Sequence, residues 1–104
     1  MQPWICPDAS PACSAAALCD GCYGRTLTYA RRQAATLGST WAERVARDPA
    51  YRPRAWPAGE PKTLAIARRL VSALATDPRL VDELARACDA GAEAWWAHRP
   101  ERYR

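Results

Sequence analysis

Residues 6–22 read C-P-D-A-S-P-A-C-S-A-A-A-L-C-D-G-C, and this segment decides how the chain folds. It holds four of the five cysteines, at positions Cys6, Cys13, Cys19 and Cys22. Cysteines at this density cross-link to one another, bind a metal ion or carry out thiol chemistry. Prolines interrupt the segment and helical periodicity is absent from its first half. We therefore expect an irregular arm that needs a cross-link or a bound group to fold around.

The remainder of the chain makes a stabilising link in this arm useful. At 104 residues the chain fits a single domain, which buries about two-thirds of the surface of its unfolded form. Phenylalanine is absent, and alanine makes up a large part of the 49% hydrophobic content. A core so short of large aliphatic side chains gains from a covalent or metal cross-link.

The chain shows no targeting or membrane signal. Residues 1–10 lack both a positively charged start and a continuous apolar stretch, so a signal peptide is not expected. No run approaches the roughly 18 uncharged apolar residues of a membrane span. We therefore expect a cytoplasmic protein without a membrane partner. Thiols stay reduced in that compartment and an odd number of cysteines cannot pair fully, so structural disulfides are not expected.

The C-x-x-C motif at Cys19 and Cys22 favours a metal ion. It brings two thiolates within reach of one ion, and a helix that starts here lowers their pKa through its backbone amides and dipole. Zinc takes four such ligands in a tetrahedron. Cys6 and Cys13 are the remaining nearby candidates, although six residues separate them where two to four are usual. The sequence predicts a zinc site formed by Cys6, Cys13, Cys19 and Cys22.

Three alternatives to zinc stay open at this point. Four cysteinates can hold an iron–sulfur cluster. A redox C-x-x-C is expected after a strand in a βαβ context, and residues 14–18 do not resemble a strand. The thiols can also be small core residues without a ligand. This last reading suits the fifth cysteine, Cys88, which shares a helical stripe with Leu84 and Trp95.

The residues C-D-G-C-Y-G-R-T-L at positions 19–27 resemble the helix-start half of treble-clef and related zinc fingers. Small bacterial and phage proteins of this kind carry such a motif at the start of a helix. The resemblance covers residues 19–32, and it implies that Cys19 and Cys22 are metal ligands.

Apolar spacing predicts two helices in the middle of the chain. The first runs from Asp20 to Leu37 and ends at Gly38, a residue typical of helix C-termini. The sequence T-W-A-E at residues 40–43 is a capping box, which predicts a new short helix that ends before residue 48. Four prolines and a glycine in residues 49–61 predict a loop, anchored by Tyr51 and Trp56.

The last part of the chain predicts a helical hairpin. One helix opens at Pro61 and runs to about Ala75. Thr76, Asp77 and Pro78 form a cap followed by proline, which predicts the start of another helix that ends near His98. A connection this short makes the two helices antiparallel neighbours. The predicted fold class is a mostly α, zinc-stabilised single domain, residues 1–104. It comprises a Cys-rich arm with the first helix (1–37), a short helix and Pro-rich loop (38–60), and a hairpin (61–99).

No catalytic constellation assembles from the sequence. His98 is the sole histidine, and near a helix C-terminus it is more often a cap or surface residue than a catalyst. The acidic pairs of the last helix alternate with Arg79 and Arg86 as on a solvated ion-pair face. Without a partnered nucleophile or acid, we expect no enzymatic activity.

The basic residues suggest a nucleic-acid partner. The net charge is +4, and Lys62 is the sole lysine among 15 basic residues. Arginine binds phosphates bidentately, and Tyr29, Tyr51 or Trp56 could stack on bases. The alternative is that these charges only keep the protein soluble. The candidate phosphate contacts are Arg25, Arg31, Arg32, Arg44, Arg47, Arg52 and Arg54.

The adjacent tryptophans Trp95 and Trp96 suggest a different partner. Neighbouring helix positions differ by about 100°, so one indole can be buried while the other points outward. An outward Trp flanked by Arg is typical of a protein-binding hot spot. The alternative is that both tryptophans close a thin core.

The sequence thus predicts a zinc-binding regulatory or accessory protein that contacts nucleic acid or its processing machinery. The alternative function is a protein adaptor or inhibitor that uses the Trp-rich C-terminal helix and could form a homodimer. A redox or iron–sulfur protein comes third.

Overall fold

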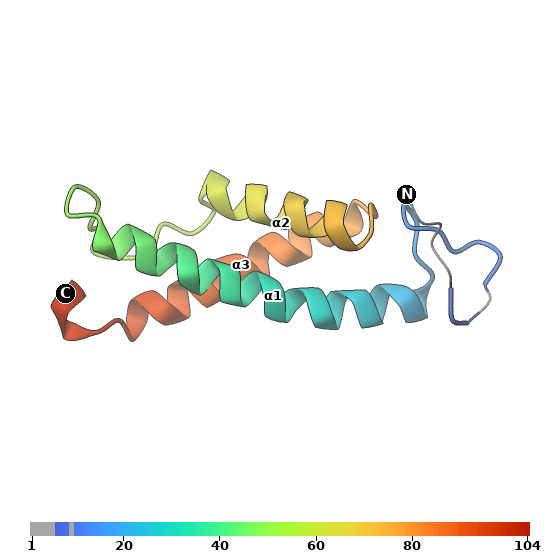
Figure 1. The fold of residues 1–104 in the computed structure, drawn as a ribbon, viewed down its shortest axis with the longest axis horizontal. Coiled ribbons are helices and arrows are strands. Elements are labelled where there is room, and N and C mark those ends of the chain that lie inside the picture. Colours follow the sequence, from blue (N-terminus) through green and yellow to red (C-terminus); the bar gives the residue numbers. More distant parts are fainter. Residues whose placement is uncertain (1–5, 9) are drawn as a thin grey trace.

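The computed structural model describes residues 6–8 and 10–104, and three α-helices make up most of them. They are α1 (Asp20–Arg47), α2 (Pro61–Leu74) and α3 (Arg79–Ala97), followed by the 3-10 helix η1 (Glu101–Tyr103). The described residues form no strand beyond one isolated bridge between Ser14 and Ala17. The predicted fold class is confirmed: a Cys-rich segment precedes a helical hairpin in a mostly α protein (Figure 1).

Helix α1 corrects the prediction of two shorter helices. It continues for 28 residues through Gly38, so the break expected there and the capping box at Thr40 are both wrong. The Thr40 hydroxyl donates to the Thr36 carbonyl one turn earlier, at 3.0 Å, as hydroxyls inside a helix do. The domain boundary drawn between residues 37 and 38 therefore falls inside a helix.

Gly38 has a packing role in place of a capping one. A Cβ built on Gly38 would lie 2.0 Å from the carbonyl oxygen of Cys88 on α3, and one on Gly91 would lie 2.2 Å from the Ala35 oxygen. The two backbones can approach this closely because neither glycine has a side chain. Small buried residues recur at every fourth position of α1: Ala30, Ala34, Gly38, Ala42 and Ala46.

Helices α1 and α3 run parallel, and α2 runs antiparallel to both (Figure 1). Arg31 bonds to Glu83 and Ser39 bonds to Gly91, so contacts advance along both helices in the same direction. The buried positions of α3 also recur at every fourth residue: Leu80, Leu84, Cys88, Ala92 and Trp96. This stripe lies against the small-residue stripe of α1.

The predicted hairpin of α2 and α3 is present within one residue of its expected bounds. Proline occupies the first position of α2, and Ile66, Ala67 and Val71 are buried. Four residues, 75–78, connect the two helices. Helix α2 thereby covers one side of α3, while α1 covers another (Figure 1).

Buried residues form two clusters along an elongated molecule with extents of 53 × 20 × 19 Å. The first lies at the arm end and includes Leu18, Cys22, Leu80 and Leu84. The second lies at the other end and consists of Ala42, Val45, Ala46, Trp56, Ala92 and Trp96. The predicted anchors of the 49–61 loop differ, since Trp56 is buried while Tyr51 is 41% exposed.

No helix in the described part of the chain combines the length and apolar character that a membrane crossing requires.

Candidate metal centre

The four cysteines of the arm converge on one point. The Sγ atoms of Cys6, Cys13, Cys19 and Cys22 all lie within 4.8 Å of one another. The Cys6 sulfur is 3.7 Å from that of Cys19 and 3.5 Å from that of Cys22. These separations are far longer than the roughly 2.05 Å of a disulfide bond. All four are free thiols arranged around a common centre.

The separations suit a tetrahedral ion. Four sulfurs at about 2.3 Å from a zinc ion lie about 3.8 Å from one another, which is the edge of that tetrahedron. The distances from the Cys6 sulfur to those of Cys19 and Cys22 match this edge within a few tenths of an ångström. The four residues can therefore hold a metal ion, and their all-sulfur chemistry suits zinc or iron.

Local turns of the arm compensate for the long spacing between Cys6 and Cys13. The Cys13 amide donates to the Ser10 carbonyl at 3.2 Å. Ser14 and Ala17 then exchange two backbone hydrogen bonds of 3.1 Å, which reverses the chain just before α1. The two halves of the cluster meet through these turns, so the site needs no standard zinc knuckle.

The C-x-x-C pair lies at the N-terminus of α1, as predicted. Cys19 is the N-cap residue and Cys22 is the third residue of the helix. The first backbone amides of a helix and its dipole stabilise negative charge. The Cys19 amide itself donates to the Cys13 sulfur at 3.3 Å. This end of α1 therefore directs positive potential at the cluster, but burial outweighs it at Cys22, so the lowered pKa predicted from the motif is wrong for that thiol.

The protein environment shifts the pKa values of Cys6 and Cys22 in opposite directions. Burial, with hydrogen bonds to Cys6 and Cys19, raises the pKa of Cys22 to about 12. A hydrogen bond from the Ser10 backbone, together with those from Cys22, Asp8 and Cys19, lowers the pKa of Cys6 to about 7 despite the opposing effect of desolvation. Four thiols this close cannot all ionise unaided, because their negative charges repel one another. A cation at the centre would remove that repulsion.

Arg25 supplies positive charge beside the cluster. Its guanidinium donates to the Cys22 sulfur at 3.5 Å and to the Asp8 carboxylate at 2.9 Å. It thus links the arm to α1 and would partly offset negative charge on the cysteines when they ionise. Arg25, predicted as a phosphate contact, therefore has a neighbouring role at the cysteines as well.

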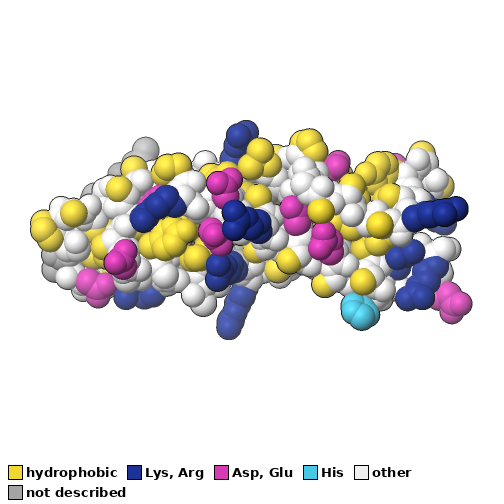
Figure 2. Space-filling view, turned by 180° about the vertical axis from the view of Figure 1, so that it is seen from behind, with side chains coloured by type: hydrophobic (Ala, Val, Ile, Leu, Met, Phe, Trp, Pro, Cys, Tyr) yellow, Lys and Arg dark blue, Asp and Glu magenta, His cyan; other side chains and the backbone are white. Residues whose placement is uncertain are grey.

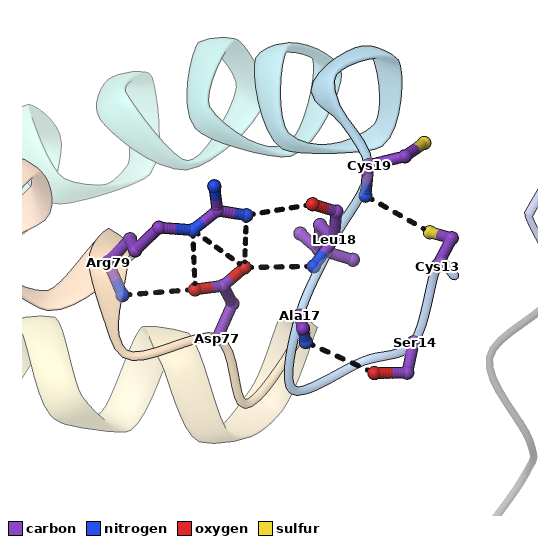
Figure 3. A network of polar contacts seen from close by, with 7 residues as sticks. All are labelled: Cys13, Ser14, Ala17, Leu18, Cys19, Asp77 and Arg79. Carbon is purple, nitrogen blue, oxygen red and sulfur yellow. Dashed lines mark hydrogen bonds and ion pairs between the residues drawn. The ribbon is translucent and has the colours of Figure 1, made fainter. Parts of the chain in front are cut away.

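Two residues that sequence reasoning missed hold the backbone next to the cluster. The Asp77 carboxylate, 1% exposed, accepts the Leu18 amide at 2.9 Å, and the Arg79 guanidinium donates to the Leu18 carbonyl at 2.7 Å (Figure 3). Sequence analysis placed Asp77 in a helix cap and Arg79 on a solvated face. Asp77 does accept the Arg79 amide at 3.0 Å. No local pattern indicates its partner 59 residues earlier.

The seven predicted phosphate contacts do not gather in one patch. Arg31 pairs with Glu83, and Arg47 pairs with Glu43. Arg25 and Arg32 line a shallow hollow on α1, whereas Arg44 lines another with Trp41 and Tyr51. The other two, Arg52 and Arg54, are exposed in the loop. On the face drawn in Figure 2, basic and acidic side chains are interspersed.

The remaining candidates lie away from the cysteines. Trp96 is 4% exposed and contacts Trp56, with ring centroids 6.2 Å apart, while Trp95 is half-buried against Tyr103. Cys88 is fully buried at the crossing of α1 and α3, as expected for a small core residue. His98 is exposed at the C-cap of α3.

No protein-family model matches this chain, and neither a curated protein nor a solved structure matches it. The resemblance of residues 19–27 to a treble clef stays a prediction, because four clustered cysteines do not by themselves identify a zinc-finger family. The fold and the site therefore have to be interpreted from their own geometry.

Proposed function

We propose that the protein binds one zinc ion through Cys6, Cys13, Cys19 and Cys22, and that this ion has a structural, non-enzymatic role. The convergence of all four Sγ atoms within 4.8 Å carries the proposal. Four protein ligands leave no open position on a tetrahedral ion, which is the arrangement of structural zinc sites. The ion would fasten the arm to the N-terminus of α1, beside the buried cluster that includes Leu18, Cys22 and Leu80.

Zinc content and matched cysteine variants test this proposal. Purified under reducing conditions, the protein is expected to contain one zinc per chain by elemental analysis. The double variant Cys19→Ser, Cys22→Ser is expected to lose it. Cys88→Ala is the matched control, since Cys88 is buried outside the cluster and its variant should keep the metal.

Two outcomes would contradict the zinc proposal. Protein without a stoichiometric metal would leave four clustered thiols with no ion to hold. Iron together with an absorption band at about 400 nm after anaerobic purification would replace zinc by an iron–sulfur cluster.

We further propose that the face of α1 beside the metal contacts single-stranded nucleic acid, consistent with a regulatory or accessory role. The specific support is a shallow hollow of about 420 Å³ lined by Gly24, Arg25, Thr28, Tyr29 and Arg32. Tyr29 is 57% exposed between the two arginines. An exposed aromatic ring stacks on bases, and flanking guanidinium groups neutralise phosphates. The surface therefore has the composition of a single-strand contact.

Binding of a fluorescent oligonucleotide tests this second proposal. Tyr29→Ala and Arg32→Gln are each expected to weaken binding, and Arg32→Gln should also reduce the slope of log affinity against log salt by about one. Arg86→Gln, on the exposed surface of α3, is the matched control. Salt-independent behaviour together with concentration-dependent dimerisation would favour the adaptor reading instead.

A further inference from the structure

The connection between α2 and α3 contacts the residue before the C-x-x-C motif. Asp77 is a carboxylate with 1% exposure, and its Oδ2 accepts the Leu18 amide at 2.9 Å. The Arg79 guanidinium contacts the same carboxylate at 2.7–3.2 Å and donates to the Leu18 carbonyl at 2.7 Å. Both polar groups of the Leu18 backbone are thus held by one charged pair, which we name the Leu18 clamp (Figure 3).

The clamp acts directly on the orientation of a cysteine ligand. The Leu18 carbonyl and the Cys19 amide belong to one planar peptide unit. Arg79 donates to the oxygen of that unit, and the Cys19 N–H of the same unit donates to the Cys13 sulfur at 3.3 Å. Fixing the plane therefore fixes both the aim of the N–H···S hydrogen bond and the place from which the Cys19 side chain starts.

Arg79 also contacts the residue after the motif. Its guanidinium lies over the Tyr23 ring, 4.5 Å from the ring centroid. Tyr23 follows Cys22 directly, so a single side chain touches the residues on either side of Cys19–Cys22. Burying Leu18, at 4% exposure, in the cluster with Leu80 and Leu84 adds apolar contact at the same place.

We propose that Asp77 and Arg79 are positioning residues of the metal centre, so that metal binding and the packing of the α2–α3 hairpin stabilise each other. This inference rests on the proposed zinc site. Partners that orient metal ligands from outside the coordination shell change metal affinity by about 10- to 100-fold when mutated. The coupling is reciprocal, because it is one free energy shared by the two events.

The first test compares Asp77→Ala with the wild type, each with and without zinc. Competition with a chromophoric chelator is expected to show at least tenfold weaker zinc binding in the variant. Thermal unfolding should show a larger loss of Tm in the presence of zinc than in its absence. A residue with a merely structural role would lower both Tm values equally.

Arg79→Lys is the second variant, and it also serves if Asp77→Ala does not fold. Arg79 is half-exposed, and lysine keeps its charge but cannot form the forked contact to Asp77 and Leu18. Weaker zinc binding is expected, with a loss of intensity in the thiolate-to-cobalt charge-transfer band when Co²⁺ replaces zinc. Arg86→Lys on the same helix is the matched control and should behave as the wild type.

The outcomes separate this inference from the zinc proposal. If the wild type binds zinc and both clamp variants bind it within twofold of the wild-type affinity, the positioning role is overturned while the zinc site stands. If the wild type itself binds no zinc, the proposed function and the positioning role fail together.

Discussion

The two ends of this molecule are closed by different chemistry. At the arm end, four thiols converge, and the buried Asp77 carboxylate with the half-exposed Arg79 holds the Leu18 backbone. At the opposite end, Trp56 and Trp96 pack with Ala42, Ala46 and Ala92, mostly through apolar contact. The comparison teaches how a chain without phenylalanine fixes both ends of long helices. The stability of the arm end depends on metal binding and on pH, because charged groups and thiols form it. The stability of the opposite end depends on buried apolar area, which neither metal nor pH changes.

Removal of the metal should have the largest effect of the four tests. It should destabilise the arm end and leave the opposite end unchanged. At free zinc about 1,000 times the Kd, bound metal stabilises the folded state by about 4 kcal/mol. Addition of a strong chelator is expected to cancel this gain. Amide hydrogen exchange should then lose protection in residues 10–32 and 75–80 while residues 41–47 and 92–97 keep theirs. Equal loss at both ends would contradict the separation.

Trp96→Ala should destabilise the packing at the opposite end. Truncation of a buried tryptophan costs about 4 kcal/mol of stability, since it removes apolar contact and leaves a cavity. Urea unfolding measures the loss, and zinc stoichiometry should stay at its wild-type value. Trp95→Ala is the control on the neighbouring, half-buried indole, and a smaller loss is expected.

Gly38→Ala tests the crossing that joins the two ends. In an exposed helix position this change stabilises by about 1 kcal/mol. At Gly38 the new Cβ would meet the Cys88 backbone, so we expect a destabilisation of about 3 kcal/mol instead. Gly24→Ala is the control, because nothing lies within 4 Å of a Cβ there. Opposite signs of the two changes, measured by urea unfolding, are the expected result.

Acid should also destabilise the arm end, and we expect this effect to be the smallest of the four tests. Hydrogen bonds from Arg79, together with those from the backbone amides of Leu18 and Arg79, lower the pKa of Asp77 from 3.8 to about 2 despite its burial. A carboxyl with a lowered pKa stabilises the fold above its unfolded value and loses that contribution as the pH falls through its folded value. We expect a loss on the order of 2 kcal/mol between about pH 4 and pH 2.

Urea unfolding of zinc-free protein against Asp77→Asn isolates this contribution from other carboxyls and from thiolate protonation. The stability difference between the two proteins should shrink as the pH falls. A difference that is constant from pH 5 to pH 2 would contradict the assignment.

The sequence was informative where the signals are local. Pro61 and the apolar spacing of residues 64–74 predicted α2 within one residue, and the C-x-x-C motif at the start of a helix predicted the centre of the cluster. Local rules misread Gly38, because a glycine at a helix crossing and one at a helix end look alike without the partner helix. The recurrence of small residues at every fourth position from Ala30 to Ala46 was the signal for one continuous helix.

Contacts between distant segments could not be predicted in the same way. Asp77 and Leu18 are 59 residues apart, and their contact exists only because α2 reverses the chain and α3 returns along α1. The arginines show the same limit, since composition does not reveal that Arg31 faces Glu83 on another helix. Composition alone therefore does not show which arginines form ion pairs within the fold.

The buried position of Cys88 turns it into an internal reporter. Its side chain is fully enclosed where α1 crosses α3, and burial raises the pKa of its thiol to about 11. An alkylating reagent can reach this sulfur only after the two long helices have separated. The reactivity of the arm thiols, in contrast, depends only on whether the arm is folded. Counting modified thiols over time would therefore date two events in one experiment: the loosening of the arm and the opening of the whole molecule.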